Sequence, residues 1–200
     1  MRCFYVVIAT GSLFMLSCNL NKTADAVLGS KSVVVHNLNT SEVLKSISVI
    51  EAAINGDINK FARKTDTLFE PHGETRVTVY FKNEQPVKVV GMRNFTNISE
   101  TTTFFVHNDS LVLVVEETVL QRKPLMHSVQ RTYVKDKKIA CILKKEKAAV
   151  PYDSFLDADL SNDTIRRSSQ DEEILLENHT ILMQNYMDIV EHTPWILPVK

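Results

Sequence analysis

Residues 74–145 constrain the fold of this 200-residue chain more than any other stretch. Three segments within them share one pattern, in which an aromatic residue is followed six residues later by an aliphatic one, with Asn, Asp or Pro in between. The segments are Phe81–Val87, Phe105–Leu111 and Tyr133–Ile139. Asn and Asp tolerate a left-handed backbone and Pro fixes its own φ, so each segment predicts a tight turn.

A tight turn between two apolar stretches predicts a β-hairpin. A three-residue loop would place the aromatic residue of each segment directly opposite its aliphatic residue, on one face of the sheet. Three such hairpins in series predict a six-strand antiparallel meander over residues 74–145. The spacing between the segments is unequal, so the pattern does not indicate a solenoid.

Apolar residues at helical spacing precede the meander. They begin after Ser41 and keep one phase across Gly56, although a glycine inside a helix costs about 1 kcal/mol relative to alanine. The residues of this stripe are Val43, Ile47, Ile50, Ile54, Ile58, Phe61 and Leu68. The stripe predicts one long helix over residues 41–69, kinked at Gly56 and packed across the apolar face of the meander.

A second helix is expected over residues 169–192. Ser169 and Glu172 have the spacing of a capping box, and a wide apolar arc on this helix needs to be covered. The last hairpin is basic and the region after it is acidic. We therefore expect the second helix to fold back against the last hairpin, with apolar contact supplying most of the energy.

The last residues, 193–200, form an apolar tail. Pro194 and Pro198 keep this tail out of regular helix. Between the tail and the N-terminal region, residues 40–192 are long enough for one domain. The predicted fold class is α+β, with the long helix packed on the meander and the second helix closing the domain.

Residues 1–17 have the composition of a secretory signal peptide. Arg2 supplies one positive charge and is followed by an apolar run, Cys3–Leu16. The run is too short, and wrongly flanked, for a membrane-spanning helix. We expect this segment to direct the chain out of the cytoplasm and to be removed.

The end of the run, Met15-Leu16-Ser17-Cys18, resembles the bacterial lipobox. The resemblance implies cleavage between Ser17 and Cys18 and attachment of lipid to the Cys18 sulfur, where several acyl chains give durable anchoring. The alternative is an ordinary secretory signal with a chance cysteine. In lipoproteins of two-membrane bacteria, an acidic residue directly after the acylated cysteine often means retention in the inner membrane. Because Asn19 stands at this position, the resemblance implies the outer membrane rather than the inner one. Residues 18–39 then form a polar tether to the domain.

The sequence carries none of the common catalytic or cofactor motifs. A net charge of −1 gives no case for nucleic acid as a partner. With five glycines in the whole chain there is no glycine-rich phosphate loop, and neither a nucleophile elbow nor paired metal-ligand spacing occurs. We therefore expect no cofactor, no metal and no catalytic residue, and we favour a non-catalytic role.

The reactive side chains that stand out have simpler interpretations. The loop Glu70–Glu74 holds two carboxylates and His72, but no distant ligand completes a metal or acid–base site, so an ordinary turn is favoured. Cys141 lies in an apolar stretch and is interpreted as a small buried hydrophobe rather than a nucleophile. Glu116 and Glu117 are neighbours on a predicted strand, so they point to opposite faces and do not form an acid–base pair.

Two resemblances to known families bear on the fold. Ala52–Asp57 followed by Phe61 resembles the helix-turn-helix opening of the nuclear-transport-factor-2-like fold. It implies a cone-shaped domain, in a fold whose members include enzymes and binding proteins. The lipobox signal, long helix, strands such as Val79–Glu84 and Leu111–Val114, and closing helix together resemble uncharacterised small envelope lipoproteins of Gram-negative bacteria. This second resemblance implies location and architecture but no known activity.

Two functions are therefore carried forward. The first is a membrane-anchored envelope lipoprotein with a non-catalytic binding or accessory role, whose partners are the membrane, through its lipid, and an envelope protein. The second is a cone-shaped domain that binds a small ligand or catalyses a reaction. A solidly filled interface between helix and sheet favours the first, and a pocket lined with polar groups favours the second.

The lipobox predicts that Cys18→Ser releases the protein from the membrane fraction and blocks removal of the signal peptide. Radiolabelled fatty acid should label the wild-type protein and not the variant. Because the label depends on the Cys18 sulfur, an unlabelled wild-type protein would remove the basis for the predicted location.

Overall fold

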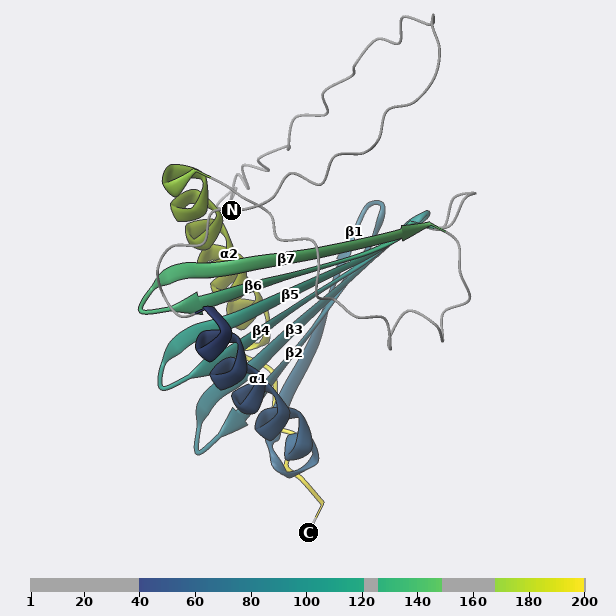
Figure 1. The fold of residues 1–200 in the computed structure, drawn as a ribbon. Coiled ribbons are helices and arrows are strands. Elements are labelled where there is room, and N and C mark those ends of the chain that lie inside the picture. The colour runs from purple at the N-terminus through teal and green to yellow at the C-terminus, as the bar shows by residue number, and fades with distance from the viewer. Residues whose placement is uncertain (1–39, 121–125, 149–167, 200) are drawn as a thin grey trace, which may run out of the picture. The chain divides into compact units, whose positions relative to one another are not determined.

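The computed structural model describes residues 40–120, 126–148 and 168–199. These residues form two α-helices, one short 3-10 helix and seven strands (Figure 1). In chain order they are α1 (Thr40–Gly56), η1 (Ile58–Lys60), β1 (Ala62–Glu70), β2 (Gly73–Lys82), β3 (Gln85–Phe95), β4 (Ile98–His107), β5 (Ser110–Leu120), β6 (Met126–Lys135), β7 (Lys138–Ala148) and α2 (Ser169–Val190). The predicted signal peptide, lipobox and tether lie outside the described residues.

The strands form one antiparallel sheet in sequential order, from β1 to β7. The predicted meander and the α+β class are therefore confirmed. The sheet has seven strands where six were predicted, and it runs from residue 62 to residue 148 rather than from 74 to 145. The additional strand, β1, pairs with β2 along its whole length, from Ala62 opposite Phe81 to Glu70 opposite Gly73.

The prediction of one helix over residues 41–69 was wrong. α1 ends at Gly56, and the second half of the predicted helix forms η1 and β1. Pairing with β2 engages all nine residues of β1 and outweighs the helical spacing of the apolar stripe. β-branched residues such as Thr65 and Thr67 are also more favourable in strands than in helices.

The three predicted hairpins are present, but their loops have two residues rather than three. The loop residues all have positive φ: Asn83 (51°), Glu84 (67°), Asn108 (49°), Asp109 (56°), Asp136 (52°) and Lys137 (57°). Positive φ at both central positions is typical of type I′ turns, whose twist matches that of the flanking strands. A register shift beside each turn places Phe105 opposite Leu113 rather than Leu111. For the same reason Tyr133 lies opposite Cys141 rather than Ile139.

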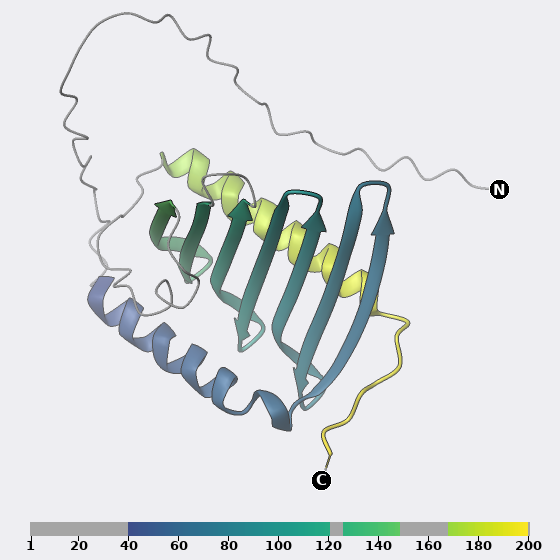
Figure 2. The same cartoon turned by 90° about the vertical axis from the view of Figure 1, so that its right-hand side faces the viewer.

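Near the type I′ turns both faces of the sheet are apolar, and there each is covered by one helix (Figures 1 and 2). On one face Val43, Ile47 and Ile54 of α1 share a core with Phe105, Leu113 and Tyr133. On the other face Tyr186 and Val190 of α2 share a core with Val77, Val79, Val89, Phe104 and Val114. Phe104 and Phe105 show how this arises, because neighbours on a strand point to opposite faces.

α2 starts beside the β6–β7 turn, as the charge pattern predicted, and it ends two residues before the predicted end at 192. Its N-cap is Ser168. The Ser168 side chain accepts a hydrogen bond from the backbone N–H of Asp171, and the Asp171 side chain accepts one from the backbone N–H of Ser168. The capping box therefore lies one residue earlier than predicted. Part of the apolar arc remains in solvent, since Ile174 is 48% and Ile181 is 51% exposed.

The tail after α2 packs on the edge of the sheet. Ile196 exchanges two backbone hydrogen bonds of 2.8 Å with Arg63 on β1. The Trp195 ring packs edge-on against Phe81 with 4.5 Å between the ring centres, and the Lys64 ammonium lies 4.7 Å from the centre of the Trp195 ring. These contacts join the tail to β1 and β2.

Gly91 allows α2 to approach the sheet, because a Cβ at this position would overlap the Tyr186 ring. Gly91→Ala should therefore lower the free energy of unfolding by about 1–3 kcal/mol, the usual cost of overpacking. Urea denaturation would measure the change. Gly56→Ala is the matched control, because an added Cβ there meets no atom within 4 Å. Equal effects of the two substitutions would contradict this packing.

Candidate binding surface

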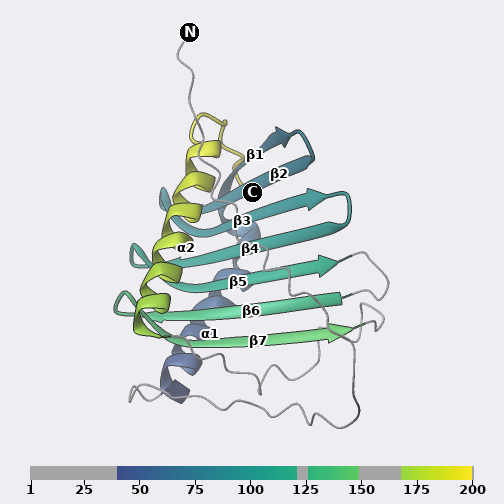
Figure 3. The same ribbon diagram turned by 90° about the horizontal axis from the view of Figure 1, so that it is seen from above.

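The strands continue beyond both helices (Figures 1 and 3). Both helices cross the part of the sheet near the type I′ turns, and no helix in the described part of the chain covers the other end. We call the uncovered sheet surface on the α1 side the open face. Its residues are Thr67, Arg76, Thr78, Val90, Met92, Thr101, Thr103, Glu117 and Val129.

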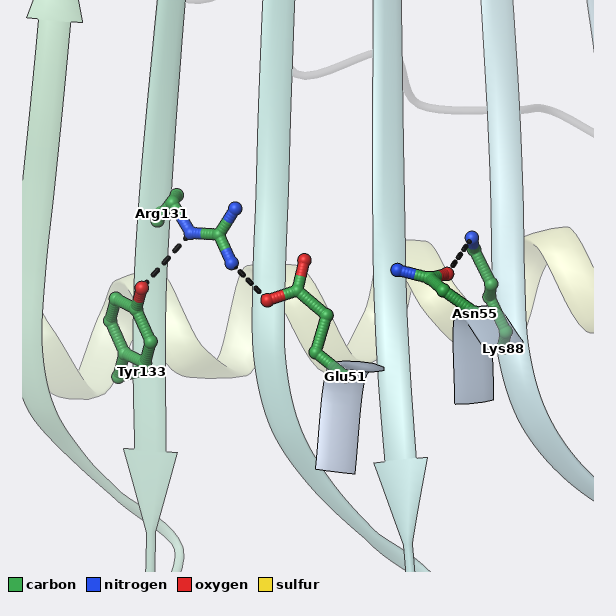
Figure 4. A network of polar contacts seen from close by, with 5 residues as sticks. All are labelled: Glu51, Asn55, Lys88, Arg131 and Tyr133. Atoms are coloured by element: carbon green, nitrogen blue, oxygen red, sulfur yellow. Dashed lines mark hydrogen bonds and ion pairs between the residues drawn. The ribbon is translucent and has the colours of Figure 1, made fainter. Parts of the chain in front are cut away.

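A largely buried ion pair lies where α1 meets the open face (Figure 4). Arg131 on β6 contacts the carboxylate of Glu51 on α1, and its Nε donates to the Tyr133 hydroxyl at 3.0 Å. The Arg131 and Glu51 side chains are only 17% and 20% exposed. Burial acts to lower the pKa of Arg131, but Tyr133 and Glu51 outweigh it, so the pKa is raised. The guanidinium therefore stays charged and holds α1 against β6.

A second cation, Lys88 on β3, lies under the same helix (Figure 4). Its Nζ donates to the Asn55 side-chain oxygen at 2.7 Å and lies 5.0 Å from the centre of the Phe105 ring. Burial lowers the pKa of Lys88, and the charge of Glu51 acts in the opposite direction. We call these contacts the polar band, formed by Glu51, Asn55, Lys88, Arg131 and Tyr133.

The open face is mixed in chemical character. Met92 is 40% exposed at its centre, and the hydroxyls of Thr65 and Thr78 share a hydrogen bond of 3.0 Å beside it. Farther along, a His127 ring nitrogen lies 2.6 Å from the Glu117 carboxylate. Hydroxyls, aliphatic side chains and a guanidinium spread over several strands suit contact with another macromolecule, and Met and Arg are enriched in protein interfaces.

On the α2 face, a buried histidine lies beside a partly exposed carboxylate. His179 is 3% exposed, and its Nε2 lies 3.3 Å from a Glu116 oxygen without hydrogen-bond geometry. Gln130 donates to the same oxygen at 2.7 Å. The Tyr186 hydroxyl is also buried, and burial raises its pKa. These side chains belong to the packing of α2 rather than to an accessible site.

Two open grooves lie between α1 and the type I′ turns. One, of about 540 Å³, is lined by Ile47 and by the β4–β5 and β6–β7 turns. The other, of about 380 Å³, is lined by Ile54 and by the β2–β3 and β4–β5 turns. Both are open to solvent, whereas the interface between α1 and the sheet is filled by apolar core residues and by the polar band.

The structure separates the reactive side chains of the loop after β1. Glu70 and Glu74 lie on opposite faces of the sheet, on either side of the β1–β2 turn, and His72 is exposed in that turn. Glu70 instead accepts a hydrogen bond of 3.0 Å from Thr75. The interpretation of this loop as an ordinary turn agrees with this arrangement, although the turn joins two strands rather than a helix and a strand.

Glu116 and Glu117 point to opposite faces of the sheet, as predicted. Cys141 is half-buried against the α1 core, and burial raises the pKa of its thiol, which disfavours the nucleophilic thiolate. Ser17 and Cys18 lie outside the described residues, so lipid attachment remains a prediction.

The polar band was not predicted from the sequence. Its ion pair joins residues 80 positions apart, and neither carries a local motif. One local signal was present, because Arg131 interrupts the otherwise apolar positions Val129 and Tyr133 on the same side of β6. A charge at such a position needs a partner from another element.

Within the described residues, no three His, Cys, Asp or Glu side chains converge as metal ligands, and no helix is both long and apolar enough to cross a membrane. No family model matches the chain, and no curated protein or solved structure is significantly similar to it. The surface chemistry of the domain is therefore the basis for proposing a function.

The protein should become more stable as the pH rises through the alkaline range, because of Lys88. Burial favours the neutral amine of Lys88, so its pKa in the folded protein lies below 10.5, the ordinary value that applies to the unfolded chain. Between the two pKa values the unfolded chain binds more protons, and the free energy of unfolding rises with pH. The free-energy cost of burying the charged amine is present below the pKa that Lys88 has in the folded protein. It is gone above the pKa that Lys88 has in the unfolded chain.

Urea denaturation at a series of pH values would measure this rise. Lys88→Gln should abolish it, so the free energy of unfolding of wild type minus that of the variant should increase with pH. Lys135→Gln, at an exposed position beside a turn, is the control and should keep the rise. A difference between wild type and Lys88→Gln that stays constant with pH would contradict the prediction.

Proposed function

We propose that this chain is a membrane-anchored envelope lipoprotein that binds another envelope protein through its open face and has no catalytic role. Its lipid is attached at Cys18 after cleavage of the Ser17–Cys18 bond. Residues 18–39 tether the domain to the membrane, the outer membrane in preference to the inner one. Neither nucleic acid nor a cofactor takes part in this role.

The open face is the observation that carries the proposal. It exposes Met92 and places Val90 and Val129 on a surface that no helix in the described residues covers. Arg131 at its border has little conformational freedom left to lose on binding, because Glu51 and Tyr133 already hold it. A pre-positioned guanidinium beside the exposed Met92 and two partly exposed valines favours a protein partner.

A small-ligand or enzymatic domain of the cone type is the second candidate. It needs an enclosed polar pocket between helix and sheet, whereas the interface under α1 is filled by apolar side chains and by the polar band, and the two grooves beside α1 are open to solvent. The nuclear-transport-factor-2-like opening implies a second helix after Asp57, and the chain instead makes a single 3-10 turn, Ile58–Lys60, before β1. Both features favour the binding role.

Met92→Asp should abolish capture of the partner when the acylated protein is purified from native membranes after mild cross-linking. A carboxylate at the centre of the open face opposes burial against a partner, while the exposed position leaves the melting temperature unchanged. Thr180→Asp, on the exposed side of α2, is the matched control and should retain the partner. Retention of the same partner by Met92→Asp would overturn the role of the open face, whatever the outcome at Cys18.

A further inference from the structure

The tail after α2 carries the densest exposed apolar surface in the described part of the chain. Within residues 195–199, Trp195 is 45%, Ile196 44%, Leu197 70% and Val199 100% exposed. Exposed apolar patches mark sites of contact with a protein or with a membrane. The neighbourhood of the tail decides between these two kinds of partner.

The sheet holds the tail in a fixed position. Ile196 exchanges two backbone hydrogen bonds with Arg63 on β1. Trp195 packs against the Phe81 ring and lies beside the Lys64 ammonium. Because these contacts already order the tail, little conformational freedom remains to be lost on binding.

Apolar side chains lie on both sides of this edge of the sheet. On one side Trp195 and Leu197 line an open groove of about 580 Å³ with Phe81. Since neighbouring residues in an extended segment point to opposite faces, Ile196 lies on the other side. A protein partner would have to enclose the edge from two sides, whereas lipid chains adapt to its shape. The arrangement therefore favours a lipid surface.

The backbone of the tail is also suited to an apolar environment. In a bilayer, each N–H or C=O group without a hydrogen-bond partner is costly. Pro194 and Pro198 have no N–H, and the N–H and C=O of Ile196 are both bonded to Arg63. Fewer polar groups must therefore lose their water here than in an ordinary exposed segment.

The charged residues that contact the tail or share its groove carry a small net positive charge. They are Lys60, Arg63, Lys64 and Lys82, against Asp57, Asp66 and Glu84. Tryptophan is enriched at the boundary between lipid chains and headgroups, and lysine extends its ammonium from that boundary into the headgroup layer. Both residue types stand at the tail.

We propose that the tail is a contact with the surface of a lipid bilayer. Trp195, Leu197 and Val199 enter the boundary between headgroups and acyl chains, and the neighbouring lysines lie among the headgroups. This contact depends neither on the open face nor on a lipid at Cys18. A lipid at Cys18 would strengthen it by holding the domain near the bilayer.

The predicted anchor and the tail are able to reach one bilayer together. α1 leads from the end of the predicted tether to the groove beside the tail (Figure 2), and its 17 residues span about 25 Å. A fully extended chain over residues 18–39 reaches about 70 Å. The tether is therefore long enough for both contacts.

Trp195 is the only tryptophan in the chain, so its fluorescence reports on the tail alone. The full-length protein purified from membranes would be reconstituted into vesicles of phosphatidylcholine and phosphatidylglycerol, with or without bromine on the acyl chains. Bromine quenches a tryptophan that reaches those chains, so the brominated vesicles should remove most of the Trp195 emission. Fatty-acid labelling of the same sample reports separately on Cys18, and quenching is expected with or without that label.

Two variants place a carboxylate at the inserted surface while keeping Trp195. Leu197→Asp and Val199→Asp should abolish quenching by brominated lipid, and the complete exposure of Val199 excludes a loss of fold in the second variant. Ile181→Asp, at an exposed apolar position on α2, is the matched control and should be quenched like the wild-type protein.

Wild-type Trp195 that brominated lipid leaves unquenched would overturn the proposal. Quenching of Leu197→Asp and Val199→Asp that is as strong as in wild type would overturn it as well. Protection of Trp195 from acrylamide that requires a second protein would overturn it in favour of a protein partner.

Lys82→Gln tests the headgroup contact. In vesicles that contain phosphatidylglycerol, the ratio of inserted to free tail should fall about fivefold, the usual effect of one cation near an anionic surface. In vesicles of phosphatidylcholine alone the ratio should stay unchanged. An equal fall in both kinds of vesicle would overturn the placement of Lys82 in the headgroup layer.

Discussion

The alternation of side chains along each strand is the constraint on which the rest of the structure depends. Because neighbours point to opposite faces, the pairs Phe104–Phe105 and Leu113–Val114 make both faces of the sheet apolar. One helix cannot cover both faces, so the fold needs α1 on one side and α2 on the other. Where the helices end, the same strands become polar on both faces, at Thr101–Thr103 on β4 and Glu117–Thr118 on β5. The uncovered end of the sheet is therefore encoded in the strands themselves.

The hairpins could be predicted because Asn and Asp mark their turns, but the register beside each turn could not. An aromatic and an aliphatic residue six positions apart fit a three-residue loop, and they also fit a two-residue loop with one additional residue in the second strand. The chain uses the second solution, and the additional residues are Val87, Val112 and Ala140. All three pack towards the α1 core, so contact with a distant helix fixes a detail that local spacing leaves open.

The prediction of helix after Gly56 was wrong for a related reason. Ile58, Phe61 and Leu68 fit the phase of the α1 stripe, whereas residues 62–70 show no clean alternation of apolar and polar side chains. A strand at the edge of a sheet has little to bury, so its pattern is weak, and pairing with β2 determines its conformation. The polar band escaped prediction because its ion pair exists only after α1 has docked across β6.

The polar band is a poor source of stability and a good means of positioning. The free-energy cost of removing Arg131 and Glu51 from water offsets much of the attraction between their charges. Replacing such a pair with apolar residues is often neutral or stabilising. The apolar core under α1 spans several strands and offers few directional contacts of its own. The Glu51–Arg131 and Asn55–Lys88 contacts fix the helix relative to β6 and β3. The same guanidinium borders the open face, so under the proposed function a carboxylate brought there by a partner would compete with Glu51 for Arg131.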